Sequence, residues 1–290
     1  MKAWSTRTEA QMRFPGILVI GATGRIGDVL RRSWPGGGVR WQTRRAAPGD
    51  GWTRVDPLAE PAALARAAQG CSVILNLAGP APGRGGDMAD HAALAEAAVR
   101  AGAASGARVL LASSAAVYGR AAGELTEAAP LHPVSDYGRA KVEMEARAAA
   151  RAAELGVAVT ALRIGNVAGL DAALGGWRPG CALDRFADGA TPARSYVGPV
   201  TLARLLAALC AAPDLPAVLN VAAPGAVEMG ALLDAAGLAW TARPAPAGAI
   251  PRVQLSVAAL ARLCPLEPVD PAAMVAEWRG LEPHMGGVAR

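Results

Sequence analysis

Lysine and aromatic side chains are both scarce in this sequence. Among its 290 residues the lysines are Lys2 and Lys141, and Phe, Trp and Tyr together make up 4%. The other basic residues are arginines, scattered through alanine-rich stretches rather than gathered in a patch. Nucleic-acid recognition relies on clustered basic residues, often with aromatic side chains that stack on bases, so we expect no nucleic-acid partner. A formal net charge of +5 suits an anionic small-molecule substrate or cofactor equally well.

The sequence also has few cysteines and no long apolar run. Cys71, Cys181, Cys210 and Cys264 stand far apart, without a CxxC pair or a histidine at ligand spacing, so we expect reduced thiols and no metal site. No segment reaches the ~18 uninterrupted apolar residues of a membrane span. Residues 1–13 contain no apolar run typical of a signal peptide. We therefore expect a cytoplasmic protein without membrane association.

The sequence does contain an alternation of short apolar runs and longer stretches with helical period. The expected strands are Ile17–Ile20, Val39–Thr43, Val73–Leu77, Arg108–Ala112 and Val157–Leu162. The expected helices between them are Ile26–Ser33, Pro61–Gln69, Met88–Gly102 and Tyr137–Leu155. Continuous apolar strands that alternate with helices are typical of a parallel sheet covered on both faces. The sequence therefore predicts an α/β protein with a Rossmann-type, doubly wound parallel sheet.

The pattern loosens after Gly169 into sequence rich in glycine and proline. It forms again as a helix at Val200–Cys210 and a strand at Val218–Val221, and then runs into a proline-rich tail. We expect residues 13–169 to form the dinucleotide-binding domain, with its sheet completed by about residues 194–222. Residues 170–193 and 223–290 are expected to form a smaller C-terminal substrate lobe.

A glycine-rich turn, Gly21-Ala-Thr-Gly24-Arg-Ile-Gly27, follows the first expected strand and opens the first expected helix. A dinucleotide pyrophosphate needs a tight turn, a close backbone approach and a helix N-terminus. Glycine supplies the first two because it lacks a Cβ atom. The alternative is a turn with a packing role alone, but the strand before it and the helix after it favour cofactor binding. The residues expected to bind the cofactor here are Gly21, Thr23, Gly24, Arg25, Ile26 and Gly27.

A YxxxK pair, Tyr137 and Lys141, lies within an expected helix, where a spacing of four places both side chains on one face. A phenol has a reference pKa of about 10, so it is a poor base at neutral pH unless a nearby cation favours the phenolate. We predict that Lys141 lowers the pKa of Tyr137. The alternative is a solvated surface pair, but a surface cation in this chain would be an arginine, so a lysine indicates that a compact ammonium is needed.

Two hydroxyl residues, Ser113 and Ser114, end the strand before Tyr118. Such residues often merely cap the next turn, but the YxxxK pair that follows favours a role in the site. The GxxGxxG turn, the SSxxVYG segment at 113–119 and the YxxxK pair together resemble the extended short-chain dehydrogenase/reductase family, also called the NAD(P)-dependent epimerase/dehydratase family. This resemblance implies that Ser114, Tyr137 and Lys141 are catalytic, and that Tyr137 and Lys141 also contact the cofactor. The Ser114 hydroxyl would hydrogen-bond the reacting oxygen of the substrate.

Further segments resemble the family in the same order along the chain. Val73–Gly79 resembles its fourth strand, which implies that the backbone of Leu77, Ala78 and Gly79 lines the cofactor. Asp56, just after the third strand, stands where the family contacts adenine.

Substrate-binding residues are implied in the same way. Leu162–Gly169 resembles the family's LRxxNVxG, which implies that Asn166 reaches the substrate. The segment that starts at Arg194 resembles RDYIHV, which implies that Arg194 holds a substrate diphosphate. The loop Pro80–Met88, which contains Arg84, is expected to form part of the substrate pocket.

The departures from the family pattern narrow the expected reaction. Dehydratases of the family carry an Asp-Glu pair after the catalytic hydroxyl, whereas Ala115 and Ala116 follow Ser114 here, which disfavours dehydration because elimination needs an acid and a base. We expect an NAD(P)-dependent epimerase or dehydrogenase/reductase that acts on a hydroxyl or carbonyl carbon of a sugar-like or nucleotide-sugar-like substrate. The alternative is a non-catalytic NAD(P)-sensing regulatory protein of the same fold, which the intact Ser114, Tyr137 and Lys141 disfavour.

The end of the second expected strand predicts the cofactor. NAD-selective proteins place an acidic residue there for the ribose hydroxyls. This chain has Thr43, followed by Arg44 and Arg45, and a guanidinium can pair bidentately with a 2′-phosphate. We therefore expect NADP, with NAD as the alternative if both arginines are solvated loop charges.

The expected helices Met88–Gly102 and Tyr137–Leu155 resemble those that form a four-helix interface in the family. Their alanine-rich surfaces allow close packing. We expect a homodimer.

Overall fold

A seven-stranded sheet forms the centre of the computed structural model, which describes residues 16–81, 85–121 and 123–285. The strand order is β12-β7-β5-β4-β1-β2-β3, and every pair is parallel. The strands are β1 (Ile17–Ile20), β2 (Val39–Thr43), β3 (Trp52–Arg54), β4 (Val73–Asn76), β5 (Arg108–Ser114), β7 (Val159–Ile164) and β12 (Val218–Val221). The order reverses between β1 and β4, and in such sheets ligands bind beyond the carboxyl ends of the strands at this switch point. The predicted Rossmann-type sheet is confirmed.

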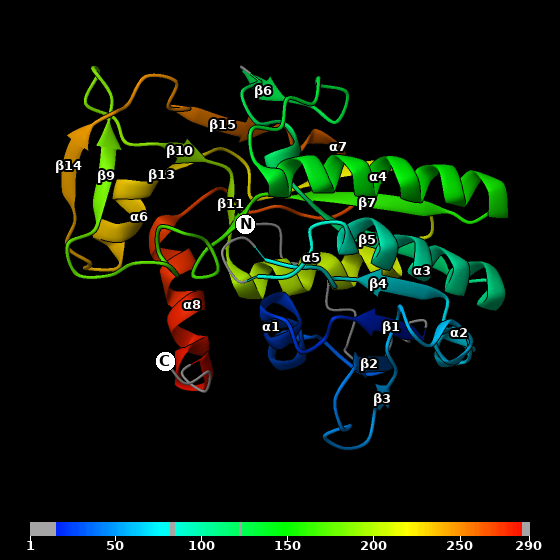
Figure 1. Cartoon of the computed structure of the whole chain (residues 1–290). Coiled ribbons are helices and arrows are strands. Elements are labelled where there is room, and N and C mark those ends of the chain that lie inside the picture. The colour runs from blue at the N-terminus through cyan, green and yellow to red at the C-terminus, as the bar shows by residue number, and fades with distance from the viewer. Residues whose placement is uncertain (1–15, 82–84, 122, 286–290) are drawn as a thin grey trace.

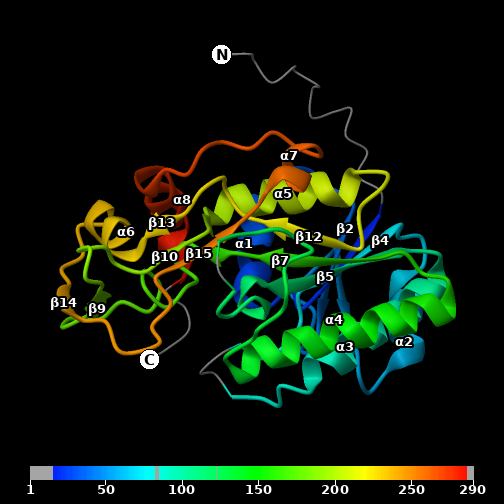
Figure 2. The same cartoon turned by 90° about the horizontal axis from the view of Figure 1, so that it is seen from above.

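Helices cover both faces of this sheet (Figures 1 and 2). The helices are α1 (Arg25–Ser33) and α5 (Pro199–Ala211) on one face, and α2 (Pro61–Ala68), α3 (Asp90–Ser105) and α4 (Asp136–Leu155) on the other. In β1, Ile17 and Val19 belong to the apolar core beneath α1 and α5, whereas Leu18 and Ile20 belong to the core beneath α2, α3 and α4. Because successive side chains point to opposite faces, a strand covered on both sides must be apolar throughout.

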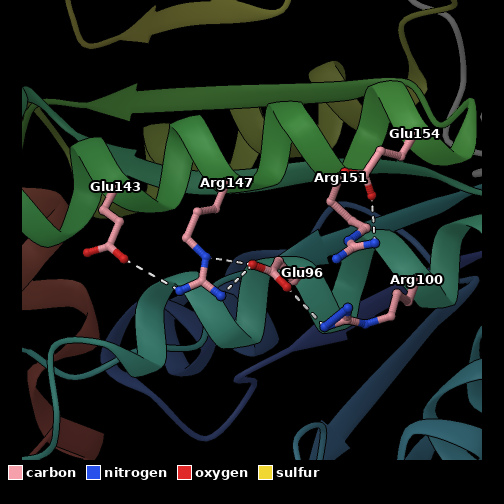
Figure 3. Close-up of polar contacts among 6 residues, drawn as sticks. All are labelled: Glu96, Arg100, Glu143, Arg147, Arg151 and Glu154. Carbon is pink, nitrogen blue, oxygen red and sulfur yellow. Dashed lines mark hydrogen bonds and ion pairs between the residues drawn. The ribbon is translucent and has the colours of Figure 1, made fainter.

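Charged side chains link α3 and α4 along their exposed edge (Figure 3). Glu96 of α3 pairs with Arg147 of α4 at 2.6 Å and with Arg100, one turn along α3, at 3.0 Å. Glu143 of α4 also pairs with Arg147, at 3.4 Å. Ion pairs whose arginines are half exposed contribute little to stability, so the packing of the two helices depends mainly on the buried alanines between them.

Short strands and helices form the rest of the chain. A four-stranded sheet has the order β13-β10-β15-β6, and β9 pairs with β14 and β8 with β11. These elements are β6 (Glu124–Leu125), β8 (Asn166–Val167), β9 (Ala182–Arg185), β10 (Ala193–Arg194), β11 (Tyr196–Val197), β13 (Val227–Glu228), β14 (Thr241–Pro244), β15 (Arg252–Leu255), η2 (Ala115–Val117), α6 (Met229–Ala235), α7 (Ala258–Ala261) and α8 (Pro271–Met285). None of the described helices is long and apolar enough to cross a membrane.

The proline-rich sequence after Val221 contains elements that the sequence pattern did not reveal: β13, β14, β15, α6, α7 and α8. These strands have two to four residues, too few for a periodic pattern, and they pair with segments far away in the sequence. Three expectations reach outside the described residues: the start of the dinucleotide-binding domain at residues 13–15, Arg84 of the expected pocket loop, and the end of the expected substrate lobe at residues 286–290.

Candidate active site

The glycine-rich turn connects β1 to α1 at the switch point of the sheet. Gly21 has a φ of 81°, and a Cβ atom there would lie 2.7 Å from the backbone nitrogen of Ala78. A Cβ atom on Gly27 would lie 2.5 Å from the carbonyl oxygen of Ala22. Both positions therefore require glycine, the first to pass the β4 loop and the second to let α1 pack on the turn. Gly24 is the N-cap of α1 and provides no side-chain cap, so the helix N-terminus presents its backbone amides to an anion.

Gln42 holds this turn in place, which the sequence analysis did not anticipate. Its side chain is 3% exposed, its Oε1 accepts a hydrogen bond from the Gly21 amide at 2.9 Å, and its Nε2 donates to the Val55 carbonyl at 2.7 Å. The sequence carries no clear signal for this role, because β2 also contains Arg40 and Thr43. Gln42 thus ties β2 and the end of β3 to the first glycine.

Tyr137 and Lys141 lie one turn apart near the N-terminus of α4. Ser135 caps this helix, since its Oγ accepts a hydrogen bond from the Gly138 amide at 3.1 Å. The Lys141 Nζ atom lies 5.6 Å from the centroid of the Tyr137 ring and donates to the Ala112 carbonyl of β5 at 2.7 Å. Lys141 is 4% exposed, so the alternative of a solvated surface pair does not describe it.

Burial sets the protonation of both groups. It lowers the pKa of Lys141 to about 7, although the Glu145 carboxylate acts in the opposite direction. It also raises the pKa of Tyr137, while a hydrogen bond with Ser114 and the charge of Arg25 act to lower it. The expectation that Lys141 lowers the pKa of Tyr137 is therefore wrong for this structure: loss of solvent outweighs the cations, and the cation that acts on the phenol is Arg25.

Ser113 and Ser114, at the end of β5, have different environments. Ser114 hydrogen-bonds Tyr137, and its Oγ also accepts from the Ala116 amide at 3.2 Å. Ser113 is buried and its hydroxyl donates to the Glu145 carboxylate. Only Ser114 of these two therefore faces the tyrosine.

Glu145, one turn after Lys141 on α4, joins this helix to the sheet through a buried ion pair, another feature missed from the sequence. Its carboxylate pairs with Arg163 of β7 at 2.7 Å, and both side chains are below 10% exposed. Arg163 also donates to Tyr118 Oη at 3.0 Å. This network fixes α4 against β5 and β7, and therefore fixes the position of Lys141.

The expected cofactor residues of the β4 loop lie beside the glycine turn. Ala78 donates to Asn76 Oδ1 at 3.0 Å, and Gly79 has a φ of 151°. The Ala78 backbone packs against Gly21, and Leu77 donates its amide to the Ile20 carbonyl at 2.9 Å. The structure thus brings the first turn and the β4 loop together.

The residues expected at the adenosine end follow β2 and β3. Arg44 and Arg45 are exposed, and the Arg45 amide donates to Thr43 Oγ1 at 3.1 Å. Asp56 Oδ1 accepts from the amides of Leu58 at 2.9 Å and Ala59 at 3.1 Å. These amides lower the pKa of Asp56, with smaller contributions from arginines that include Arg44.

The two expected substrate residues are held within the short strands after β7. Asn166 of β8 hydrogen-bonds Tyr196 of β11. Arg194 of β10 donates to the carbonyls of Ala193 at 2.7 Å and Ile250 at 2.9 Å, so its guanidinium is already engaged by backbone.

An open groove of about 660 Å³ lies on β9 and β14. Its lining includes Arg185, Phe186 and Arg243, and none of its residues belongs to the Ser114–Tyr137–Lys141 group. The groove is therefore separate from the proposed chemistry.

Comparison with known proteins identifies a family and a fold. The model of the NAD dependent epimerase/dehydratase family matches residues 17–176. No curated protein sequence matches the chain significantly.

Several solved structures share the fold. One is the UDP-glucose 4-epimerase of Thermus thermophilus in complex with NAD, with 21% identity, 91% of this chain and 99% of that chain covered, and a TM-score of 0.70. Another is DesIV, the dTDP-glucose 4,6-dehydratase of Streptomyces venezuelae with NAD bound, with 20% identity, coverages of 91% and 97%, and a TM-score of 0.68. A third is a short-chain dehydrogenase/reductase superfamily protein from Agrobacterium tumefaciens with bound NAD, with 18% identity, coverages of 93% and 97%, and a TM-score of 0.74.

Proposed function

Since the chain belongs to the NAD dependent epimerase/dehydratase family, we propose that it is an NAD(P)-dependent oxidoreductase or epimerase. Its substrate is sugar-like or nucleotide-sugar-like and reacts at a hydroxyl or carbonyl carbon. The observation that carries this proposal is the meeting of Ser114, Tyr137 and Lys141, three residues from two elements, at the carboxyl end of β5. The similar structures with NAD, which are described as an epimerase and a dehydratase, support the same class of chemistry.

The residues at the switch point fit a dinucleotide. The Gly21 turn leaves no room for a side chain, and the N-terminus of α1 carries no side-chain cap that would compete with a pyrophosphate. In this proposal Gly21, Thr23, Gly24, Arg25, Ile26 and Gly27 hold the pyrophosphate, the backbone of Leu77, Ala78 and Gly79 lines the adjoining part, and Asp56 lies toward the adenine. When bound, the nicotinamide would donate or accept the hydride.

The side chains divide the proton chemistry between them. Because burial raises the pKa of Tyr137, its phenol keeps its proton at neutral pH, which is the form that protonates a carbonyl oxygen. Ser114 hydrogen-bonds the same reacting oxygen and keeps it close to the phenol. Lys141, held by the Ala112 carbonyl, would contact the bound cofactor beside Tyr137. Asn166 and Arg194 would contact the substrate with the donors that their present hydrogen bonds leave available.

The residues after Ser114 favour epimerisation or simple oxidation and reduction over dehydration. Ala115 and Ala116 form η2 directly after Ser114, and neither methyl side chain can transfer a proton. Elimination of water needs an acid and a base near the sugar. The fold itself is shared with a dehydratase, so the argument against dehydration depends on these two positions.

The proposal is tested by turnover. The purified protein is incubated with NADP⁺ or NAD⁺ and a panel of uridine and thymidine diphosphate hexoses, while absorbance at the nicotinamide band reports net oxidation and proton NMR reports epimerisation. Activity that is lost in Tyr137→Phe supports the proposal. Tight cofactor binding without turnover of any sugar, equal in wild type and Tyr137→Phe, would instead favour a regulatory NAD(P)-sensing protein.

We further propose that the cofactor is NADP and that the protein is a homodimer. Arg44 and Arg45 are exposed after β2, where an adenosine 2′-phosphate would lie. The surface of α3 and α4 carries alanines and the ion pairs around Glu96 and Arg147. A second copy that packs there with its own α3 and α4 would form a four-helix interface. Light scattering at micromolar concentration tests the dimer: a dimeric mass is expected, and the charge reversal Arg147→Glu should shift it toward the monomer.

A further inference from the structure

His91 is a buried histidine at the start of α3 that the proposed mechanism does not use. Its side chain is 2% exposed. Its ring lies between the Gly79 turn and Tyr137, which are parts of the proposed cofactor-binding and catalytic machinery.

The contact with Tyr137 is an edge-to-face packing of two rings. The ring centroids are 5.5 Å apart and the planes meet at 71°. This arrangement is the favoured one for aromatic pairs, because the positive edge of one ring meets the negative face of the other.

The contact with Gly79 is equally close. A Cβ atom built on Gly79 would overlap the His91 ring at Nδ1 and Cε1. The imidazole therefore rests directly on the backbone of the turn, and the space between the turn and Tyr137 is filled by one five-membered ring.

The imidazole is uncharged in this setting. Among the described residues, neither ring nitrogen has a hydrogen-bond partner of good geometry. Burial and the nearby Lys141 charge lower the pKa of His91 to about 4, although the Pro80 backbone acts in the opposite direction. The titratable groups that face it are Tyr137 and Lys141, both from α4.

We propose that His91 is a positioning residue for the oxidoreductase site, a spacer that fixes the distance between the Gly79 turn and the Tyr137 ring. Because the turn is expected to line the cofactor, one ring would set the position of the tyrosine hydroxyl relative to the bound cofactor. This inference rests on the proposed function. It predicts that removing the ring disturbs Tyr137 and Lys141 before it disturbs the fold.

The chain offers a direct readout that does not depend on a substrate. It has two lysines, Lys2 and Lys141, so ¹³Cε-lysine NMR resolves the titration of Lys141 with Lys2 as an internal reference. It has three tyrosines, Tyr118, Tyr137 and Tyr196, and Tyr137→Phe assigns the Tyr137 ring signals. Both readouts remain valid even if the turnover test fails.

The variants are His91→Ala, which removes the spacer, and His91→Leu, which keeps the volume but not the ring. Val99→Ala is the matched control, because Val99 lies on the same helix in the buried core beneath α3 and α4. In His91→Ala we expect water to reach Lys141, so that its pKa rises by about one unit or more, and the Tyr137 ring signals to shift. His91→Leu should keep the pKa of Lys141 low but still shift the Tyr137 ring signals.

Once a substrate is known, His91→Ala should lower kcat on the order of tenfold to a hundredfold, as misplaced catalytic groups do, with the cofactor Kd nearly unchanged. Val99→Ala should leave the Lys141 titration and the Tyr137 signals as in wild type. The inference is overturned if His91→Ala leaves both readouts unchanged, if Val99→Ala changes them equally, or if His91→Leu reproduces the wild type in full. If His91→Ala fails to fold, the Tyr137 signals of His91→Leu decide alone.

Discussion

Lys141 Nζ lies 5.6 Å from the centroid of the Tyr137 ring, one helical turn farther along α4. The lysine is anchored by the Ala112 carbonyl and the tyrosine by Ser114, so each side chain of the pair is fixed by the carboxyl end of β5. The carboxyl end of β5 and the N-terminal part of α4 thus hold the proposed acid/base group and its neighbouring ammonium.

Replacing Tyr137 by Phe should abolish proton transfer while keeping the ring. We expect turnover to fall about 10²–10⁴-fold, the usual contribution of a positioned acid or base, with cofactor affinity nearly intact. The edge contact with His91 should persist, because phenylalanine keeps the aromatic face. Steady-state kinetics and calorimetric titration of the cofactor measure the two effects, and a variant with wild-type kcat on the true substrate would show that Tyr137 is not the acid/base group.

The buried ammonium of Lys141 predicts how stability depends on pH. Its pKa is about 7 in the folded protein, against about 10.4 for an unperturbed lysine. Between these values the unfolded chain binds more protons than the folded chain, so the free energy of unfolding should rise with pH from about pH 7, by up to about 1.4 kcal/mol per pH unit. Below the folded pKa this slope falls to zero, because the lysine is then charged in both the folded and the unfolded state.

Urea unfolding at intervals from pH 7 to 8.5 measures this slope, and the difference from a Lys141 variant isolates the lysine, because both chains carry the same thiols, which have raised folded pKa values and an ordinary pKa of about 8.5. The low pKa of His91 acts below this range, since its folded and unfolded values are about 4 and 6.5. The control is Lys141→Met, which keeps an unbranched apolar stem and should flatten the curve. Parallel curves for wild type and Lys141→Met would contradict a depressed pKa for Lys141.

The parts of the fold that the sequence predicted are those with local signals. The strand Ile17–Ile20 is apolar at every position because both faces are buried, and the Gly21 turn requires glycine because the β4 loop passes against it. The pairing of Tyr137 with Lys141 follows from helical spacing alone.

The parts that the sequence did not predict depend on contacts between distant segments. Gln42 looks like an ordinary polar residue of β2 until the Gly21 amide is found 21 positions away in the chain. The role of His91 follows from its contacts with Gly79 and Tyr137, and the role of Glu145 follows from its ion pair with Arg163. The pKa of Tyr137 was predicted with the wrong sign for the same reason: spacing reveals a neighbouring cation but not the loss of solvent.

Gly27 should be intolerant of even one added methyl group. Its Cβ position lies 2.5 Å from the Ala22 carbonyl oxygen, so Gly27→Ala forces α1 away from the turn, and we expect a loss of about 1–3 kcal/mol in the free energy of unfolding. Gly37 is the matched control, because it is exposed and a Cβ atom there would meet nothing within 4 Å. Thermal and urea unfolding compare the two variants. Equal stability of Gly27→Ala and Gly37→Ala would contradict the prediction, because it would show that α1 and the turn can accommodate a methyl group at Gly27 without loss of stability.

The proposed preference for NADP depends on two arginines with unequal surroundings. Arg44 and Arg45 are both exposed after β2. The charge of Arg44 already acts on the Asp56 carboxylate, so we expect Arg45 to contribute more to the binding of a 2′-phosphate. We expect NADP(H) to bind more tightly than NAD(H) by on the order of 1–3 kcal/mol, roughly 5- to 150-fold, as charge-assisted hydrogen bonds allow.

Calorimetric titration of both cofactors on wild type, Arg44→Ala, Arg45→Ala and the double variant measures each contribution, and Arg45→Ala should cost more NADP affinity than Arg44→Ala. The control removes the same charge elsewhere, with Arg66→Ala and Arg204→Ala on the exposed sides of α2 and α5, and should keep the preference. Equal affinities in the wild type, or a preference for NADP that survives loss of both Arg44 and Arg45, would assign the selectivity to other residues.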